Sequence, residues 1–165
     1  IFFISLFFTV NVFSDTPHFI DFSKVLNESN AGKEAQLILK NKLKNSVDKF
    51  NNEQKNLREE EKKIINERKN LKVENYQKKV QALRIKVSNM QKEKQISFQK
   101  IAKLRNESKE KLLVALKPLI KNYMEKNNIK LVIDKKTVLL GDKNLEITNQ
   151  IIDTLNKELK SLNIK

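Results

Sequence analysis

The chain of 165 residues offers few side chains of the kinds that catalyse reactions. His18 is its one histidine and it has no cysteine, so a metal site of imidazole and thiolate ligands finds no second ligand beside it. The acidic run at residues 59–61 precedes Lys62 and Lys63, which favours a solvated helix face or ion pairs with these lysines over an acid–base site. Asp21 and Asp134 each end or interrupt an apolar run, where a carboxylate can cap a turn. We predict no enzyme, no cofactor and no metal.

The chemistry that the sequence does offer is electrostatic. Lysine and arginine number 34 against 20 acidic residues, a net charge of +14. Residues 31–117 carry 24 basic and 11 acidic residues, or +13, and the rest of the chain carries only +1. A compositional bias toward lysine acts on every segment, so it does not explain this uneven distribution. The expected partners are acidic polymers, anionic lipid surfaces or acidic proteins.

The first thirteen residues are uncharged and mostly apolar. A membrane span needs about 20 apolar residues, whereas Val12 and Ser14 provide small side chains at positions −3 and −1 of a cleavage site. We predict a signal peptide over residues 1–14, truncated at its start. A short membrane anchor is the alternative.

A long helical hairpin is predicted over residues 31–117, which contain one glycine and no proline. Apolar residues recur at heptad spacing in both halves, and this favours an antiparallel coiled coil. Polar residues, among them Lys94 and Ser97, interrupt the apolar seam, so the two arms should pair weakly. The turn is expected around residues 70–76. The outgoing column is Leu43, Phe50, Leu57, Ile64 and Leu71, and the returning column begins Tyr76, Val80, Leu83, Val87 and Met90.

A small body is predicted from residues 15–30 and 118–165. Residues 19–22 are typical of a strand, and residues 131–134 and 137–140 of one or two more. Thr148 is the expected N-cap of a last helix, with Ile147 placed to contact Ile152. That helix has one apolar face, made of Ile151, Ile152, Leu155 and Leu159. Pro118 is expected to break or kink the returning helix.

These few elements are too little to close a core by themselves, and exposed sheet edges must be covered. We therefore predict a symmetric homo-oligomer. Its interface would consist of the apolar strand residues Phe19, Ile20, Phe22, Leu131, Val132, Ile133, Val138, Leu139 and Leu140.

The order of these motifs resembles the Skp (OmpH) family of periplasmic chaperones. The resemblance rests on the exported leader, the segments at 19–22, 25–26 and 29–33, the charged hairpin, and the segments at 129–134 and 146–148. Relatives usually have Asp where this chain has Glu146. The resemblance implies a homotrimer of α+β class. It further implies that a small β-barrel body would form on homotrimerisation, and that long α-helical coiled-coil hairpin arms would enclose a cavity for unfolded outer-membrane β-barrel proteins.

The function expected from this combination is an ATP-independent periplasmic holdase. Gly32 and Gly141, the only two glycines, are 109 residues apart, so no glycine-rich phosphate loop exists. Basic arm residues would attract the client and interrupted apolar patches would hold it weakly; the apolar residues could instead serve only to pair the arm helices. The candidate client-binding residues are Lys72, Lys78, Lys79, Val80, Leu83, Arg84, Lys86, Val87 and Met90.

Two other classes of function remain as alternatives. Basic helices neutralise nucleic-acid phosphates without reading sequence, but the arms contain only Phe50, Tyr76 and Phe98 for base stacking, and the leader places the chain outside the cytoplasm. A structural coiled-coil tether would need a continuous seam. Anionic lipid or lipopolysaccharide is a further candidate partner, and nucleic acid is disfavoured.

Overall fold

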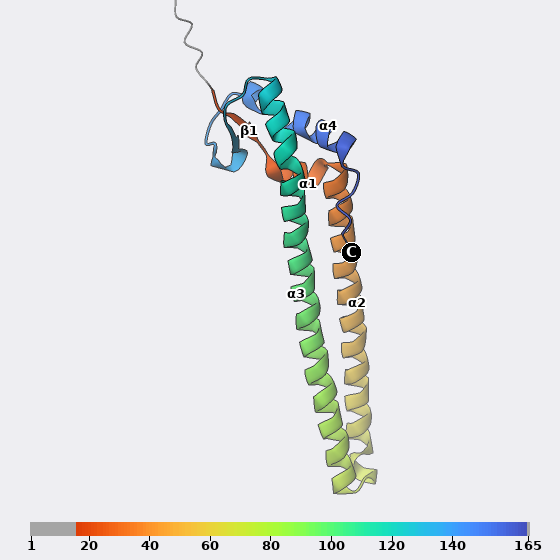
Figure 1. The fold of residues 1–165 in the computed structure, drawn as a ribbon. Coiled ribbons are helices and arrows are strands. Elements are labelled where there is room, and N and C mark those ends of the chain that lie inside the picture. The colour runs from red at the N-terminus through yellow and green to blue at the C-terminus, as the bar shows by residue number, and fades with distance from the viewer. Residues whose placement is uncertain (1–15, 165) are drawn as a thin grey trace, which may run out of the picture.

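The computed structural model of the chain describes residues 16–164, and the predicted signal peptide lies outside them. Figure 1 shows a long two-helix hairpin with a small body at the end opposite its turn. The chain forms β1 (His18–Ile20), α1 (Phe22–Glu28) and α2 (Asn30–Glu67), then a short 3-10 turn (Arg68–Asn70). It continues with α3 (Val73–Lys126), β2 (Val132–Asp134), two further 3-10 turns (Lys135–Thr137 and Lys143–Leu145) and α4 (Thr148–Glu158).

The hairpin predicted from the heptad spacing is confirmed. α2 ends at Glu67 and α3 begins at Val73, so the turn falls within a few residues of its expected position. Pro118 was expected to break or kink the helix. It does not break it, because α3 continues through the proline to Lys126. The carbonyl that loses its partner belongs to Val114, which is exposed, and water can satisfy it. Buried Leu116 and Leu119 hold the helix on both sides of the proline.

The body closes a core within one chain, which corrects the expectation that its elements were too few. The additional core side chains come from the root of the hairpin, because α2 begins and α3 ends inside the body. Apolar side chains of β1, α1, α4 and the roots of α2 and α3 pack together. The largest apolar side chains among those that are almost completely buried are Val25, Leu112, Leu116, Ile151 and Leu155.

The sheet is smaller than the sequence predicts. β1 pairs in parallel with β2, with Phe19 opposite Ile133. Phe22 lies in α1 rather than in a strand, because the Asp21 carboxylate accepts a hydrogen bond from the Lys24 backbone N–H (2.9 Å) and so starts a helix.

Residues 137–140 form no strand either. The Asp134 carboxylate accepts from the Lys136 N–H (3.0 Å), and the Thr137 hydroxyl donates to the Asp134 carbonyl (2.7 Å). The chain therefore turns immediately after β2. The expected turn-capping roles of Asp21 and Asp134 are both confirmed.

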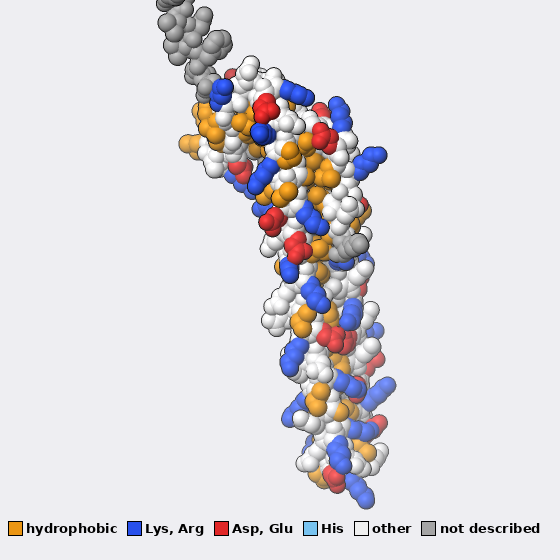
Figure 2. All heavy atoms as spheres, viewed as in Figure 1, with side chains coloured by type: hydrophobic (Ala, Val, Ile, Leu, Met, Phe, Trp, Pro, Cys, Tyr) orange, Lys and Arg blue, Asp and Glu red, His pale blue; other side chains and the backbone are white. Residues whose placement is uncertain are grey.

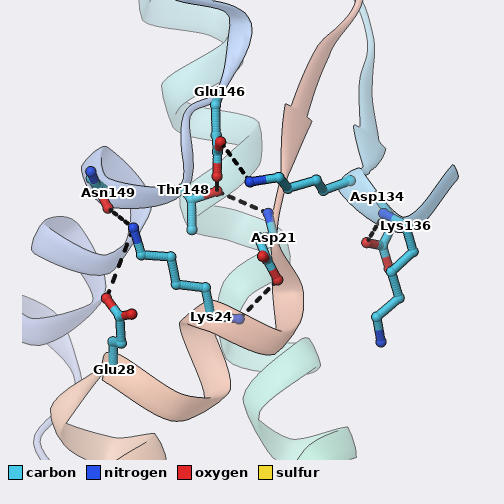
Figure 3. A network of polar contacts seen from close by, with 9 residues as sticks. Asp21, Lys24, Glu28, Asp134, Lys136, Glu146, Thr148 and Asn149 are labelled. Atoms are coloured by element: carbon cyan, nitrogen blue, oxygen red, sulfur yellow. Dashed lines mark hydrogen bonds and ion pairs between the residues drawn. The ribbon is translucent and has the colours of Figure 1, made fainter. Parts of the chain in front are cut away.

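Thr148 is the first residue of α4 and not its N-cap, since no side chain caps this helix. Its buried hydroxyl instead accepts from the Asp21 backbone N–H (2.9 Å) and donates to a carboxylate oxygen of Glu146 (2.9 Å). Figure 3 shows these contacts, together with the hydrogen bond that the Lys24 N–H donates to the Asp21 carboxylate. One hydroxyl thus joins the start of α1 to the start of α4.

The Thr148 hydroxyl generates a prediction about stability. Thr148→Val keeps the shape of the side chain but leaves a part-buried N–H and a carboxylate oxygen without this partner. We expect a loss of about 1–3 kcal/mol in the free energy of unfolding, measured by chemical denaturation. Thr148→Ser keeps the hydroxyl and should lose less. Equal losses in the two variants would show that the methyl group, and not the hydrogen bonds, stabilises this junction.

Candidate functional site

The seam between α2 and α3 contains few large apolar contacts. The rings of Phe50 and Phe98 pack at a tilt of 51° with their centroids 6.4 Å apart, and Ile64 and Met90 are buried nearer the turn. Between the Phe pair and the body, the hydroxyls of Ser46 and Ser97 hydrogen-bond across the seam (3.0 Å). The polar interruption expected from the sequence is confirmed at Ser97.

A cleft of about 690 Å³ opens between the two helices near the turn, and we call it the tip cleft. Val80, Leu83 and Val87 are half-buried there, so each both contacts the opposite helix and remains accessible. Met90 is buried, so its side chain packs mainly within the hairpin. The structure therefore brings the predicted apolar residues together, and Arg84 lines the same cleft. The residues from α2 are Gln54, Leu57, Arg58, Glu61, Ile64 and Ile65.

The predicted basic residues divide into two groups. Lys79 pairs with Glu67 and Lys86 with Glu60, and Lys78 pairs with Glu74 within α3. Lys72 and Arg84 make no ion pair with any residue that the structure describes. Glu60 was expected to be solvated or to pair with a neighbouring lysine, and its partner is Lys86 on the other helix. Exposed pairs of this kind contribute little to stability, but they neutralise part of the charge.

The predicted interface residues of the body also divide by exposure. Phe19, Ile20 and Phe22 are buried within the single chain, and Val132, Ile133 and Val138 are half-buried. The side chains of Leu139 and Leu140 are almost fully exposed, at 102% and 94%, and Leu131 is 51% exposed. Beside them β2 has β1 as its only paired strand in the described chain. We call β2 with residues 138–140 the sheet edge.

An ion pair next to the sheet edge shifts two pKa values. The Lys135 ammonium donates to the Glu146 carboxylate (2.9 Å). This bond, helped by the bond from Thr148, lowers the pKa of Glu146, although burial opposes the shift. The bond to Glu146 likewise raises the pKa of Lys135. The pair attaches the turn after β2 to the segment before α4.

Within residues 16–164 no group of three or more His, Cys, Asp or Glu residues is placed to hold a metal ion. His18 starts β1, and its Nδ1 lies 3.2 Å from the Thr16 carbonyl. No helix among the described residues has the length and apolar character needed to cross a membrane.

The sequence interpretation missed α1 (Phe22–Glu28). The local signal was present, because Asp21 precedes Phe22, Val25 and Leu26 at helical spacing. The longer apolar run from Phe19 to Phe22 suggested a strand instead.

The chain was compared with known proteins. The family model described as "Outer membrane protein (OmpH-like)" matches residues 18–155. Among curated proteins, none matches the chain. The solved structure of an OmpH-like candidate outer membrane chaperone from Caulobacter crescentus CB15 superposes with a TM-score of 0.81 at 16% sequence identity, covering 94% of each chain. At that identity the structural likeness establishes the fold.

The lowered pKa of Glu146 predicts a pH dependence. Such a carboxylate stabilises the fold fully above its unfolded pKa, and this contribution is lost as the pH falls through its folded pKa. Glu146→Gln should therefore lower the thermal unfolding temperature by about 2 °C at pH 7 and by progressively less in acid. The exposed Glu158, which makes no ion pair among the described residues, provides the control variant Glu158→Gln. A deficit that persisted unchanged at pH 3 would contradict the assignment.

Proposed function

The chain belongs to the OmpH-like family, and on this premise we propose that it is an ATP-independent periplasmic holdase chaperone for unfolded outer-membrane β-barrel proteins. The observation that carries the proposal is the position of the charge. The excess of +13 lies on residues 31–117, most of which form the arms that extend away from the body. Figure 2 shows lysine and arginine side chains along the whole visible length of the hairpin.

Charge on an extended arm acts before contact is made. An unfolded client with acidic segments is attracted over roughly 8–10 Å at physiological salt, and this attraction raises the rate of association more than the final affinity. Basic residues without acidic partners, such as Lys72 and Arg84, carry this attraction. Three such arms would act on one client together.

Half-buried apolar residues supply the second part of the mechanism. Val80, Leu83 and Val87 line the open tip cleft and are not sealed inside the hairpin. Each offers a small contact area to a client, so many contacts are needed and none is strong. A client held in this way can leave without a nucleotide-driven step.

We further propose that three copies of the chain assemble through the sheet edge. Two strands are too few for an independent sheet, β2 has one unpaired side among the described residues, and Leu139 and Leu140, a few residues after β2, expose apolar side chains. Strands of three chains would cover these residues and complete a small β-barrel body. The arms of the trimer would then enclose the cavity for the client.

No observation favours the nucleic-acid alternative. Phe50 and Phe98 pack against each other, and the Arg68 guanidinium covers the Tyr76 ring at 5.8 Å. The aromatic side chains of the arms are therefore occupied and do not form a platform for base stacking. The interrupted seam likewise does not favour a rigid tether.

The role of arm charge can be tested on lysine and arginine residues that lack acidic partners. Gln is nearly as good a helix former as Lys, so helicity should be retained when the charges are removed. Association with an unfolded outer-membrane protein should slow several-fold at low salt and depend less on salt, as measured by stopped-flow fluorescence. The variant is Lys72→Gln, Arg84→Gln, Lys92→Gln and Lys94→Gln.

A matched control removes the same charge from the body or its margin. Its changes are Lys126→Gln, Lys143→Gln, Lys157→Gln and Lys160→Gln. If both variants slow association equally, net charge alone matters and the arms have no special role. If neither does, electrostatic capture by the arms is wrong.

The apolar contacts have a different kinetic signature. Leu83→Ser and Val87→Ser together should shorten the lifetime of the client complex and leave the association rate nearly unchanged. Circular dichroism checks that the hairpin remains helical. A complex with an unaltered lifetime would show that these residues only pair the arm helices.

Assembly can be tested at the sheet edge. Leu139→Asp and Leu140→Asp together place charges where strands of different chains would meet, so light scattering should detect monomers with parental helicity. Val73→Asp and Ile85→Asp change two exposed apolar residues of the arm and should leave the trimer intact. A sheet-edge variant that stayed trimeric would show that other surfaces hold the subunits together.

A further inference from the structure

A second cleft, of about 650 Å³, lies at the root of the hairpin where α1, α2 and α3 meet, and we call it the arm-root cleft. α1 contributes Phe22, α2 contributes Leu39 and α3 contributes Phe98 and Ile101. Figure 1 shows α1 near the root of the hairpin, beside both arm helices. The lining extends from Phe98 to Lys109 on α3, a length of about 16 Å at 1.5 Å per residue.

The two ends of the arm-root cleft differ in polarity. Toward the arm, the lining consists of the apolar side chains of Leu39, Leu43, Phe98 and Ile101. Toward the body, α3 contributes Arg105 and Lys109, which are four residues apart and therefore lie on the same face of the helix. A ligand that fits this lining has an apolar chain at one end and a negative charge at the other.

The charged end has no carboxylate among its lining residues. By contrast, Glu61 lines the tip cleft, and Glu125 lines a smaller cleft near the end of α3. Arg105 makes no ion pair or hydrogen bond with any described residue. The Lys109 ammonium lies 5.8 Å from the centre of the Phe22 ring and not beside an acid. Both cations are therefore available to an anion from outside the chain.

We propose that the arm-root cleft binds the anion of a medium-chain fatty acid. The carboxylate would lie between Arg105 and Lys109, where a charge-assisted hydrogen bond to the guanidinium is strong and directional. The acyl chain would follow the groove toward Phe98 and cover the apolar side chains of Leu39 and Ile101. An extended twelve-carbon chain is comparable in length with the cleft.

This site is separate from the residues proposed to hold client proteins, which line the tip cleft. Occupancy would fill space between α1 and both arm helices at the point where the hairpin leaves the body. The inference does not depend on the proposed holdase activity, and the two are tested by different measurements.

Binding can be measured by isothermal titration calorimetry with the full mature chain and dodecanoate below its micelle concentration. Dodecan-1-ol and dodecyltrimethylammonium have the same chain with no charge or with a positive charge. Dodecanoate should bind at least about tenfold more tightly than either, because only the carboxylate is attracted to both cations. Equal binding of the three probes would overturn the proposal, as would no binding of dodecanoate.

Matched variants locate the site. Arg105→Gln with Lys109→Gln should weaken dodecanoate binding by about tenfold and bring it close to that of dodecan-1-ol. Lys111→Gln with Lys117→Gln removes the same charge from α3 outside the cleft and should leave binding unchanged. Ala102→Leu, which narrows the groove, should weaken binding of both probes, whereas Ala82→Leu at an exposed site outside it should not.

Two outcomes in this series would reject the cleft as the site. Equal losses in the two charge variants would show unspecific attraction to a basic protein. Unchanged binding in Ala102→Leu would place the acyl chain elsewhere.

Arg105 and Lys109 are both exposed, so their replacement should not unfold the helix, and circular dichroism verifies this. Lys109→Gln alone should give an intermediate loss of dodecanoate binding. Client protection, measured in parallel, should be retained by the Arg105 and Lys109 variants.

Discussion

Burial of both hairpin roots in the body core is the interaction on which the rest of the structure depends. Leu112 and Leu116 of α3 are almost completely buried, as are Val25 of α1 and Ile151 and Leu155 of α4. Each such side chain contributes roughly 1.5–3 kcal/mol when it leaves water. Because α2 and α3 run without a break from this core to the turn, the packing at the root sets the direction of the whole arm.

Farther from the body, the packing between α2 and α3 leaves some apolar side chains accessible. A tightly packed coiled coil would bury all its apolar side chains and leave none for a partner. Here the Phe50–Phe98 contact and buried Met90 hold the helices together. Other positions between the two helices are polar, as at the Ser46–Ser97 pair, or half-exposed, as in the tip cleft. The arm is thereby stable enough to remain a hairpin while Val80, Leu83 and Val87 stay accessible.

The small sheet depends on polar contacts as much as on its two strands. Thr148 links Asp21 to Glu146 (Figure 3). Glu146 in turn pairs with Lys135, which follows β2. The Ile147 N–H also donates to the Phe19 carbonyl (3.0 Å), so the segment before α4 is attached to β1 directly. These contacts attach three parts of the chain to one another, β1 with the start of α1, the turn after β2, and the segment before α4.

The sequence by itself determined the hairpin, its turn, the basic charge of the arms, the apolar face of α4 and the strand positions near His18 and Val132. Heptad spacing, turn-capping carboxylates and charge runs are properties of residues that lie close together in the chain, so they can be recognised there. Only the tertiary structure decided that Phe22 begins a helix, that α3 passes through Pro118, and which lysines have acidic partners. It also decided where the two clefts open. At Phe22 two local signals compete, an apolar run and the Asp21 cap, and the sequence does not rank them. Buried Leu116 and Leu119 hold the helix around Pro118. The clefts and the ion pairs between α2 and α3 join segments that are distant in the chain.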